Sequence, residues 1–354
     1  MATTIGYVKE NIRVKISDSS PNEHIAMFGI SGSGKSTRIS TIVDDIASSG
    51  GTVIAFDLGG RDFSNISGNV NRISARNDGI DIQLFDLESV KSGKESYVNY
   101  LSYIVDTFTN IFHLGVRQQG ALREAVQYAL QNQDKFLTEM EAIASGLSEQ
   151  QSTVAYGVLN KLWQILYGNI FRSSKKRFRK GAINIVSFQG INPSAQKELT
   201  EILLSFLWRK VRITDNRDEK ICVVVDEFHH YAKYKTSVLL EMLRESRKYG
   251  VNIILATQSV EGFSRNILGA VHQTAVQLFF RPAVSDMKKI AEMVDAENSS
   301  RWLLKLKQLR VGESIATGNL SLNGREVPHP LLIHSGFNLV SNETSIRELR
   351  GKRK

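Results

Sequence analysis

The stretch FGISGSGKST, residues Phe28–Thr37, decides the fold expected for this chain. Its glycines, Lys35 and Ser36 match the pattern G-x-x-x-x-G-K-[ST], in which backbone N–H groups wrap the phosphates of a nucleotide. The apolar run HIAMFGI leads into the motif, and the helix-like RISTIVDDIA follows it. Because the pattern requires a strand before it and a helix after it, this context favours a phosphate-binding loop over a glycine-rich turn with a chance lysine.

Each side chain of such a loop has a chemical task. Lys35 reaches the β- and γ-phosphate oxygens, and the hydroxyl of Ser36 ligates Mg²⁺. The predicted cofactors are therefore ATP and Mg²⁺. The residues expected to bind the nucleotide are Gly29, Ser31, Gly32, Ser33, Gly34, Lys35, Ser36 and Thr37.

Length and composition are those of an ordinary folded protein. The chain has 354 residues, of which 42% are hydrophobic and 23% charged, so one elaborated α/β domain with a large core is expected. The formal net charge of +9 favours a polyanionic partner, either nucleic acid or an anionic membrane surface. Many basic proteins have neither role.

Cysteine usage and hydropathy bear on the compartment. Cys222 is the only cysteine, so no intramolecular disulfide can form, and a reducing, cytoplasmic environment is predicted. The N-terminal MATTIGYVKENIRVK lacks the apolar segment of a secretory signal, and no apolar run approaches the roughly 20 residues that span a bilayer. We therefore expect a soluble protein without direct membrane insertion.

Apolar runs alternate with helix-like segments along the chain. Each run is apolar on both faces, which is typical of a buried strand in a parallel sheet. The expected strands are residues 24–30, 52–57, 80–86, 182–188, 221–226, 251–257 and 275–280. The alternation predicts an α/β fold with a mostly parallel sheet covered by helices on both faces.

This rhythm breaks between about residues 91 and 180, where helix-like segments occur without a clear strand. We interpret this part as a helical insertion within a single domain of residues 1–354. Residues 1–23 are expected to form a short hairpin-like extension. Residues 341–354 read as a frayed basic tail.

Two adjacent carboxylates, Asp226 and Glu227, follow the apolar run ICVVV directly. Open α/β sheets bind ligands at the carboxyl ends of their strands, and paired charges there are costly unless they serve a site. Asp226 is expected to hold Mg²⁺, through water. Glu227 is expected to polarise the water that attacks the γ-phosphate. The alternative is an Asp-Glu pair that caps the next helix.

The strand VNIILAT ends at Thr257 and is followed by Gln258. An amide at the same sheet edge is suited to hydrogen-bond the γ-phosphate or the attacking water, and so to distinguish ATP from ADP. The alternative is an ordinary turn residue at a strand end.

The order of these blocks resembles the HerA/FtsK superfamily of ring-forming ATPases. Within it the chain is most similar to the HerA-like branch and to the related conjugation ATPases of type IV secretion systems. The resemblance covers about residues 5–334. Its blocks are GISGSGKST, AFDLGG, INIVSFQGINPSAQKELTEILLSFLW, VVVDEFHHY, LLEMLRESRKYGVNIILATQS and QLFFRPAVSDMKKIAEMV.

This resemblance implies a RecA-like core that assembles as a homohexamer, with ATP between subunits and duplex DNA in the central channel. Hydrolysis would drive translocation along the DNA. An arginine of the neighbouring subunit would stabilise the charge that develops on the transferred phosphoryl group. Arg247 and Arg281 are the candidates, and for each a surface cation or a helix-end cap is the alternative.

The chain departs from the family in two places. Only a short stretch precedes the first core strand, where HerA helicases carry a β-barrel domain, and this puts the docking of a nuclease partner in doubt. AFDLGG matches the usual Asp-Pro-x-Gly turn loosely, through Asp57 and Gly60. Two other functions stay open: a secretion or conjugation ATPase with a protein substrate, and a nucleotide-gated scaffold that moves nothing.

Two further clusters have both a functional and a structural interpretation. FRSSKKRFRK, residues Phe171–Lys180, interleaves Phe178 with cations that can neutralise DNA phosphates, although a solvated loop fits it equally well. The adjacent His229 and His230 lack a third ligand in view, so we assign no structural metal and expect them to pack or to support the carboxylates.

Overall fold

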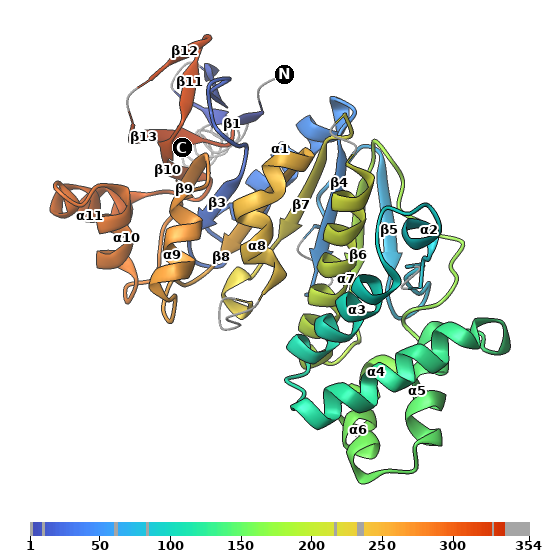
Figure 1. Cartoon of the computed structure of the whole chain (residues 1–354). Coiled ribbons are helices and arrows are strands. Elements are labelled where there is room, and N and C mark those ends of the chain that lie inside the picture. Colours follow the sequence, from blue (N-terminus) through green and yellow to red (C-terminus); the bar gives the residue numbers. More distant parts are fainter. Residues whose placement is uncertain are drawn as a thin grey trace, which may run out of the picture.

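A long mixed sheet organises the chain in its computed structural model, which describes residues 3–8, 11–59, 63–82, 85–215, 218–231, 237–327 and 329–336. Its thirteen strands run across Figure 1 from the upper left to the right. The parallel part contains β3 (Ile25–Phe28), β4 (Thr52–Asp57), β5 (Val70–Ser74), β6 (Ile183–Ser187), β7 (Ile221–Val225), β8 (Val251–Thr257) and β9 (Val276–Phe279). The antiparallel part contains β1 (Thr4–Tyr7), β2 (Arg13–Ile16), β10 (Glu313–Gly318), β11 (Leu320–Leu322), β12 (Arg325–Glu326) and β13 (Leu331–His334).

The strand order of the parallel part decides which chain segments meet. The order is β9-β3-β8-β7-β4-β6-β5, so β8 lies between the strand before the glycine-rich loop and the strand before the two carboxylates. Phe28 pairs with Thr257, and Val225 pairs with Leu255, in parallel register. Because parallel strands end at the same edge, their carboxyl ends converge there. The predicted parallel sheet of a RecA-like fold is confirmed.

Side-chain alternation along the strands divides the core between two faces. In β3, Ile25 and Met27 belong to one buried cluster, and Ala26 and Phe28 to the other. The first face is covered by α1 (Lys35–Ser48). On the other face, three helices lie side by side in Figure 1: α7 (Pro193–Thr214), α8 (Val238–Glu245) and α9 (Arg265–His272).

A helical region lies between β5 and β6, and its last three α-helices project away from the sheet at the lower right of Figure 1. Ser96, Thr138 and Ser152 accept hydrogen bonds from backbone N–H groups at the starts of three of its helices, as N-caps do. Its buried side chains are continuous with the core on the α7 face. Its helices are α2 (Glu88–Lys91), α3 (Tyr97–Ile111), α4 (Val116–Gln131), α5 (Glu139–Glu149) and α6 (Thr153–Tyr167), with a 3₁₀ turn, η2 (Gln133–Lys135).

The strand predicted at residues 80–86 is wrong. Of its described residues, only Ile80 pairs, through an isolated bridge to Phe171. The edge strand is instead β5, with the sequence VNRIS, in which Asn71 and Ile73 are buried and Arg72 between them is exposed, because one of its faces is open. The predicted basic tail, residues 341–354, lies outside the described residues.

The antiparallel part joins the two ends of the chain. Its order is β10-β13-β1-β2-β11-β12, and β10 continues the parallel part by pairing antiparallel with β9. Two helices connect β9 to β10 along the chain: α10 (Met287–Val294) and α11 (Ser299–Gln308). Among the described helices, none combines the length and the apolar character needed to cross a membrane.

Candidate functional site

The glycine-rich loop leaves β3 and enters α1, which begins at Lys35. Gly34 has a φ of 106°, and a Cβ there would lie 2.7 Å from the backbone nitrogen of Gly312. A Cβ at Gly29 would lie 2.7 Å from the Cβ of Phe280. These two positions therefore admit only glycine, which explains the spacing of the motif. Around them Ser31, Gly32 and Thr37 are exposed, Ser33 is buried and Ser36 is half-buried.

Lys35 is buried and its ammonium group lies within the loop. Its Nζ donates hydrogen bonds to the carbonyl oxygens of Gly29, at 2.6 Å, and of Ile30, at 3.1 Å. The N-terminus of α1, with its first N–H groups and positive dipole end, opens at the same place. The loop thus combines a fixed positive charge with backbone donors, which is the chemistry that a polyphosphate requires.

The two carboxylates follow the carboxyl end of β7 and differ in burial, since Asp226 is buried and Glu227 is half-buried. Asp226 is buried, and its Oδ1 accepts a hydrogen bond of 2.8 Å from the N–H of Glu227. Glu227 has a φ of 53°, a left-handed conformation that costs a non-glycine residue about 1–2 kcal/mol. This turn sends the two carboxylates in different directions, so they can do different work.

Glu227 is held from two sides. Its Oε1 accepts a hydrogen bond from Nε2 of Gln258, at the end of β8. Its Oε2 lies 3.1 Å from Nδ1 of His229, within the 3₁₀ turn η3 (Phe228–His230). Nδ1 of His229 also lies 3.4 Å from the hydroxyl of Thr257, and the carbonyl of Thr257 accepts a hydrogen bond from Gly29. A continuous network therefore connects the ends of β7, β8 and β3.

These contacts set the ionisation of Glu227. Burial raises the pKa of its carboxyl, but the hydrogen bonds from His229 and Gln258, together with the charges of His229 and Lys35, outweigh burial and lower the pKa below its ordinary value. The group is therefore a carboxylate at neutral pH. Such a weak base is suited to orient and polarise a water molecule.

The two predicted arginines lie in different places. Arg281 follows β9, and its carbonyl accepts a hydrogen bond of 3.0 Å from the N–H of Ile30, so it borders its own loop. Arg247 lies in the 3₁₀ turn η4 (Ser246–Tyr249), before the start of β8 and therefore at the opposite edge of the sheet. Both side chains are exposed. The structure thus brings Lys35, Asp226, Glu227 and Gln258 to one edge and separates Arg247 from it.

Sequence reasoning missed Arg38, which contacts the loop indirectly, through Gly312. The side chain is 1% exposed, and its guanidinium donates to the carbonyl of Ile5, to the carbonyl of Gly312 at 3.2 Å and to the hydroxyl of Ser335 at 3.1 Å. Burial lowers its pKa to about 10. The N–H of Gly312 in turn donates to the carbonyl of Ser33, at 3.0 Å. The sequence signal that could have indicated this role is an arginine on the apolar face of α1, three residues after Lys35.

The edge has ligands that fit Mg²⁺. The half-buried hydroxyl of Ser36 lies in the first turn of α1, and the buried Asp226 lies two strands away. Within the described ranges, no group of three His, Cys, Asp or Glu side chains is arranged to hold a metal ion by itself. One hydroxyl and one carboxylate suit a hard cation that takes its other ligands from phosphate oxygens and water.

Comparisons with known proteins identify a family and a fold for this chain. Residues 3–211 match the family model described as helicase HerA, central domain. The chain is 24% identical over 336 residues to the DNA double-strand break repair helicase HerA of Saccharolobus solfataricus, covering 88% of this chain and 65% of that protein. The corresponding protein of Sulfolobus acidocaldarius is 24% identical over 332 residues, with 88% and 66% covered. The chain therefore spans slightly less than two thirds of these relatives.

Two solved structures share the fold at low sequence identity. VirB4 of Thermoanaerobacter pseudethanolicus superposes with a TM-score of 0.73 and 14% identity, covering 96% of this chain and 98% of that one. The unbound bacterial conjugative coupling protein TrwB has a TM-score of 0.61 and 12% identity, with 94% and 88% covered. The resemblance found in the sequence is confirmed: the chain belongs to the family of the HerA helicase central domain.

Proposed function

We propose that this chain is an ATPase that couples ATP hydrolysis to movement along duplex DNA. One observation carries the proposal: the phosphate loop and Glu227 are linked across three adjacent strand ends by Gln258 and Thr257. A loop alone only holds a phosphate. A carboxylate kept ionised and aimed by two donors adds the means to hydrolyse it.

The residues divide the reaction among them. The loop N–H groups and Lys35 bind the β- and γ-phosphates. Ser36 and Asp226 would hold Mg²⁺, Asp226 through water, and the ion would neutralise charge on the phosphate oxygens. Glu227 orients the attacking water. Gln258, which bonds Glu227 in this structure, can exchange that bond for one to the γ-phosphate or to the water, and so link nucleotide state to the base.

DNA as the substrate has separate support. The relatives are named DNA double-strand break repair helicases, and the chain carries a formal net charge of +9. We extend both observations to a homohexameric ring in which a neighbouring subunit completes each nucleotide site. Arg247 fits that role better than Arg281, because it lies at the edge opposite its own loop while Arg281 borders it.

The deciding experiment measures ATP hydrolysis with no DNA, with duplex DNA and with single-stranded DNA, together with particle size by light scattering. Duplex-stimulated hydrolysis by a hexamer is expected. Hydrolysis that ignores DNA would favour the alternative, a secretion or conjugation ATPase acting on a protein substrate. A monomer that binds ATP without turnover, in the presence of DNA, would favour the nucleotide-gated scaffold.

A further inference from the structure

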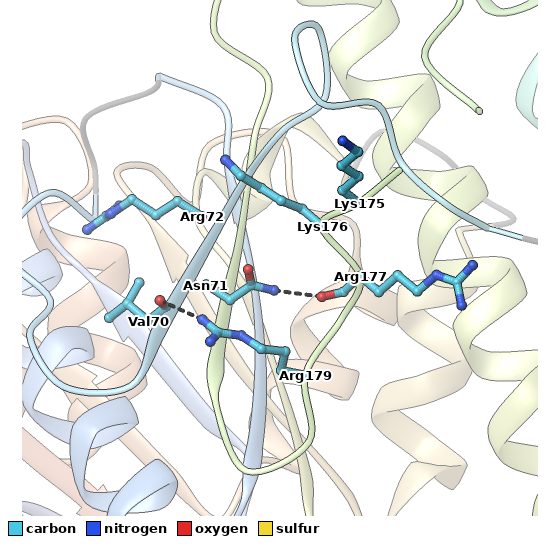
Figure 2. Close-up of a pocket in the computed structure, with 7 residues that line it drawn as sticks. All are labelled: Val70, Asn71, Arg72, Lys175, Lys176, Arg177 and Arg179. Atoms are coloured by element: carbon cyan, nitrogen blue, oxygen red, sulfur yellow. Dashed lines mark hydrogen bonds between the residues drawn. The ribbon is translucent and has the colours of Figure 1, made fainter. Parts of the chain in front are cut away.

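A cationic hollow lies at the free edge of the sheet, away from the nucleotide site (Figure 2). Two chain segments form it: β5, and the segment that returns from α6 to β6. Among the described residues, no carboxylate lines it, and Val70 is its only apolar lining residue. The lining residues are Val70, Asn71, Arg72, Lys175, Lys176, Arg177 and Arg179.

Two buried amides hold the returning segment against β5. Nδ2 of Asn71 donates to the carbonyl of Arg177 at 2.8 Å and to Oδ1 of Asn184 at 2.9 Å. Asn184, which is fully buried, donates to the carbonyl of Arg179 at 2.9 Å and accepts from its N–H at 2.8 Å. The backbone that carries these cations is therefore fixed to the sheet, so their arrangement is a property of the fold.

Two arginines of the hollow are oriented by the main chain. Nη2 of Arg179 donates to the carbonyl of Val70 at 2.8 Å, as Figure 2 shows. Nη2 of Arg72 donates to the carbonyl of Phe63, also at 2.8 Å. A guanidinium has five N–H donors, so each group keeps donors for a ligand after it has been positioned. Preorganised arginines of this kind favour phosphate oxygens.

The remaining cations are available to a ligand. Lys176 pairs with Asp78 at 3.0 Å and Arg177 with Asp81 at 2.9 Å, but the two basic side chains are 51% and 74% exposed. Exposed pairs contribute little and exchange readily. Lys175 has no ion-pair partner among the described residues. A polyanion can therefore engage Lys175, Lys176 and Arg177 without breaking a buried interaction.

We propose that this hollow binds the phosphodiester backbone of duplex DNA, without reading its sequence. The inference rests on the proposed function and names a surface through which that substrate is held. An acyl chain or an apolar peptide would meet five cationic side chains here and, among the described residues, one apolar side chain, Val70. The cations come from an edge strand and a loop, not from a helix that could enter the major groove, so they contact phosphates and not bases.

The position of the hollow fits a separate binding surface. In the strand order β7-β4-β6-β5, three strand spacings, roughly 15 Å, separate β5 from the strand that leads into Asp226. The hollow also borders the helical region, because its second segment returns from α6. DNA held here would therefore contact both the RecA-like core and the base of that region, while the nucleotide site stays open.

The test replaces Lys175, Lys176 and Arg177 together by glutamine. A matched control replaces Arg301, Lys305 and Lys307, three exposed cations on α11, and changes the net charge equally. Fluorescence anisotropy of a labelled random-sequence duplex, without nucleotide and over a range of salt, gives affinity and its salt dependence. The hollow variant is expected to bind about tenfold more weakly or worse near 0.1 M salt. The plot of log K against log salt should become shallower, with the magnitude of its slope reduced by about two to three.

The control should stay close to the unmodified protein in both measurements. Affinity and slope in the hollow variant equal to those of the control would overturn the inference. DNA-free ATP hydrolysis should be unchanged in both variants, since neither triplet contacts the nucleotide site. If the unmodified protein hydrolyses ATP but binds no duplex, the DNA part of the proposed function fails. If it binds duplex and the hollow variant binds with the same affinity, only the hollow is refuted.

Discussion

The parallel and antiparallel parts of the sheet differ in what they contribute to the nucleotide site. Three adjacent parallel strands end in Lys35's loop, in Gln258 and in the Asp226-Glu227 pair. The antiparallel part contributes supporting contacts to that edge. It supplies Gly312 and Ser335, which contact the loop backbone and Arg38.

This difference has a geometric cause. Parallel strands all end at one edge and so gather side chains from distant parts of the chain. Antiparallel strands alternate in direction and cannot do so, but their turns can buttress a neighbouring loop. We therefore expect substitutions in the parallel part to change hydrolysis, and substitutions at the contact with the antiparallel part to change the shape of the loop and thus nucleotide affinity.

The largest effect is expected for Glu227→Gln. Removing the carboxylate that polarises the water should lower kcat by about 10²–10⁴-fold. ATP affinity, measured by calorimetry, should be retained because the loop is untouched. Glu292→Gln, the same change at an exposed position of α10, should leave turnover unaltered. Undiminished hydrolysis in Glu227→Gln would remove Glu227 from its role.

Lys35→Ala should act on binding first. Loss of a charge-assisted hydrogen bond to phosphate corresponds to about 1.5–3 kcal/mol, or roughly a 10–100-fold weaker ATP affinity. Calorimetry against Lys307→Ala, an exposed lysine of α11, provides the comparison. Equal affinities in the two variants would contradict the phosphate-loop assignment.

Arg38→Met tests the support from the antiparallel part. The substitution removes the Arg38 donor from the carbonyl of Ile5 and leaves the carbonyl of Gly312 with the Ser335 hydroxyl, so we expect a loss of about 1–3 kcal/mol in unfolding free energy. KM for ATP should rise several-fold while kcat stays near its original value, because Glu227 and Gln258 are not touched. Steady-state kinetics and thermal unfolding measure these quantities.

Ile42→Ala separates this effect from general destabilisation. Ile42 is fully buried on the same helix, and its truncation should cost at least as much stability, about 2–5 kcal/mol, without contacting the loop. KM should then be unchanged. A rise in KM in Ile42→Ala equal to that in Arg38→Met would mean that Arg38 has no specific effect on the loop.

The smallest effect concerns the pH dependence of turnover. The pKa of the Glu227 carboxyl lies below its ordinary value of 4.5, so the group is still ionised at pH 4.5. Hydrolysis should therefore decline only as the pH falls below 4.5. His229→Gln removes one of the groups that lower this pKa, and should shift the acid decline of kcat to higher pH. A pH profile that is identical in the two proteins would exclude His229 as a positioning residue for Glu227.

Local motifs could be predicted from the sequence, whereas pairings between distant segments could not. The glycine-rich loop is contiguous, and its conformation follows from glycine and from the start of a helix. The edge strand β5 was missed because VNRIS has only two apolar residues and places the polar Asn71 at a buried position, while the expected strand at residues 80–86 looked apolar on both faces. β1 pairs with β13 from the other end of the chain, and no local pattern indicates that pairing.

The sequence by itself determined the phosphate loop, the carboxylates after ICVVV and the glutamine after VNIILAT, because each depends on neighbouring residues and on where a strand ends. Only the tertiary structure decided that Gln258 and His229 hold Glu227, that Arg38 and Gly312 support the loop, and that five cations line one hollow. These features depend on strand order and register, which arise from contacts between segments far apart in the chain.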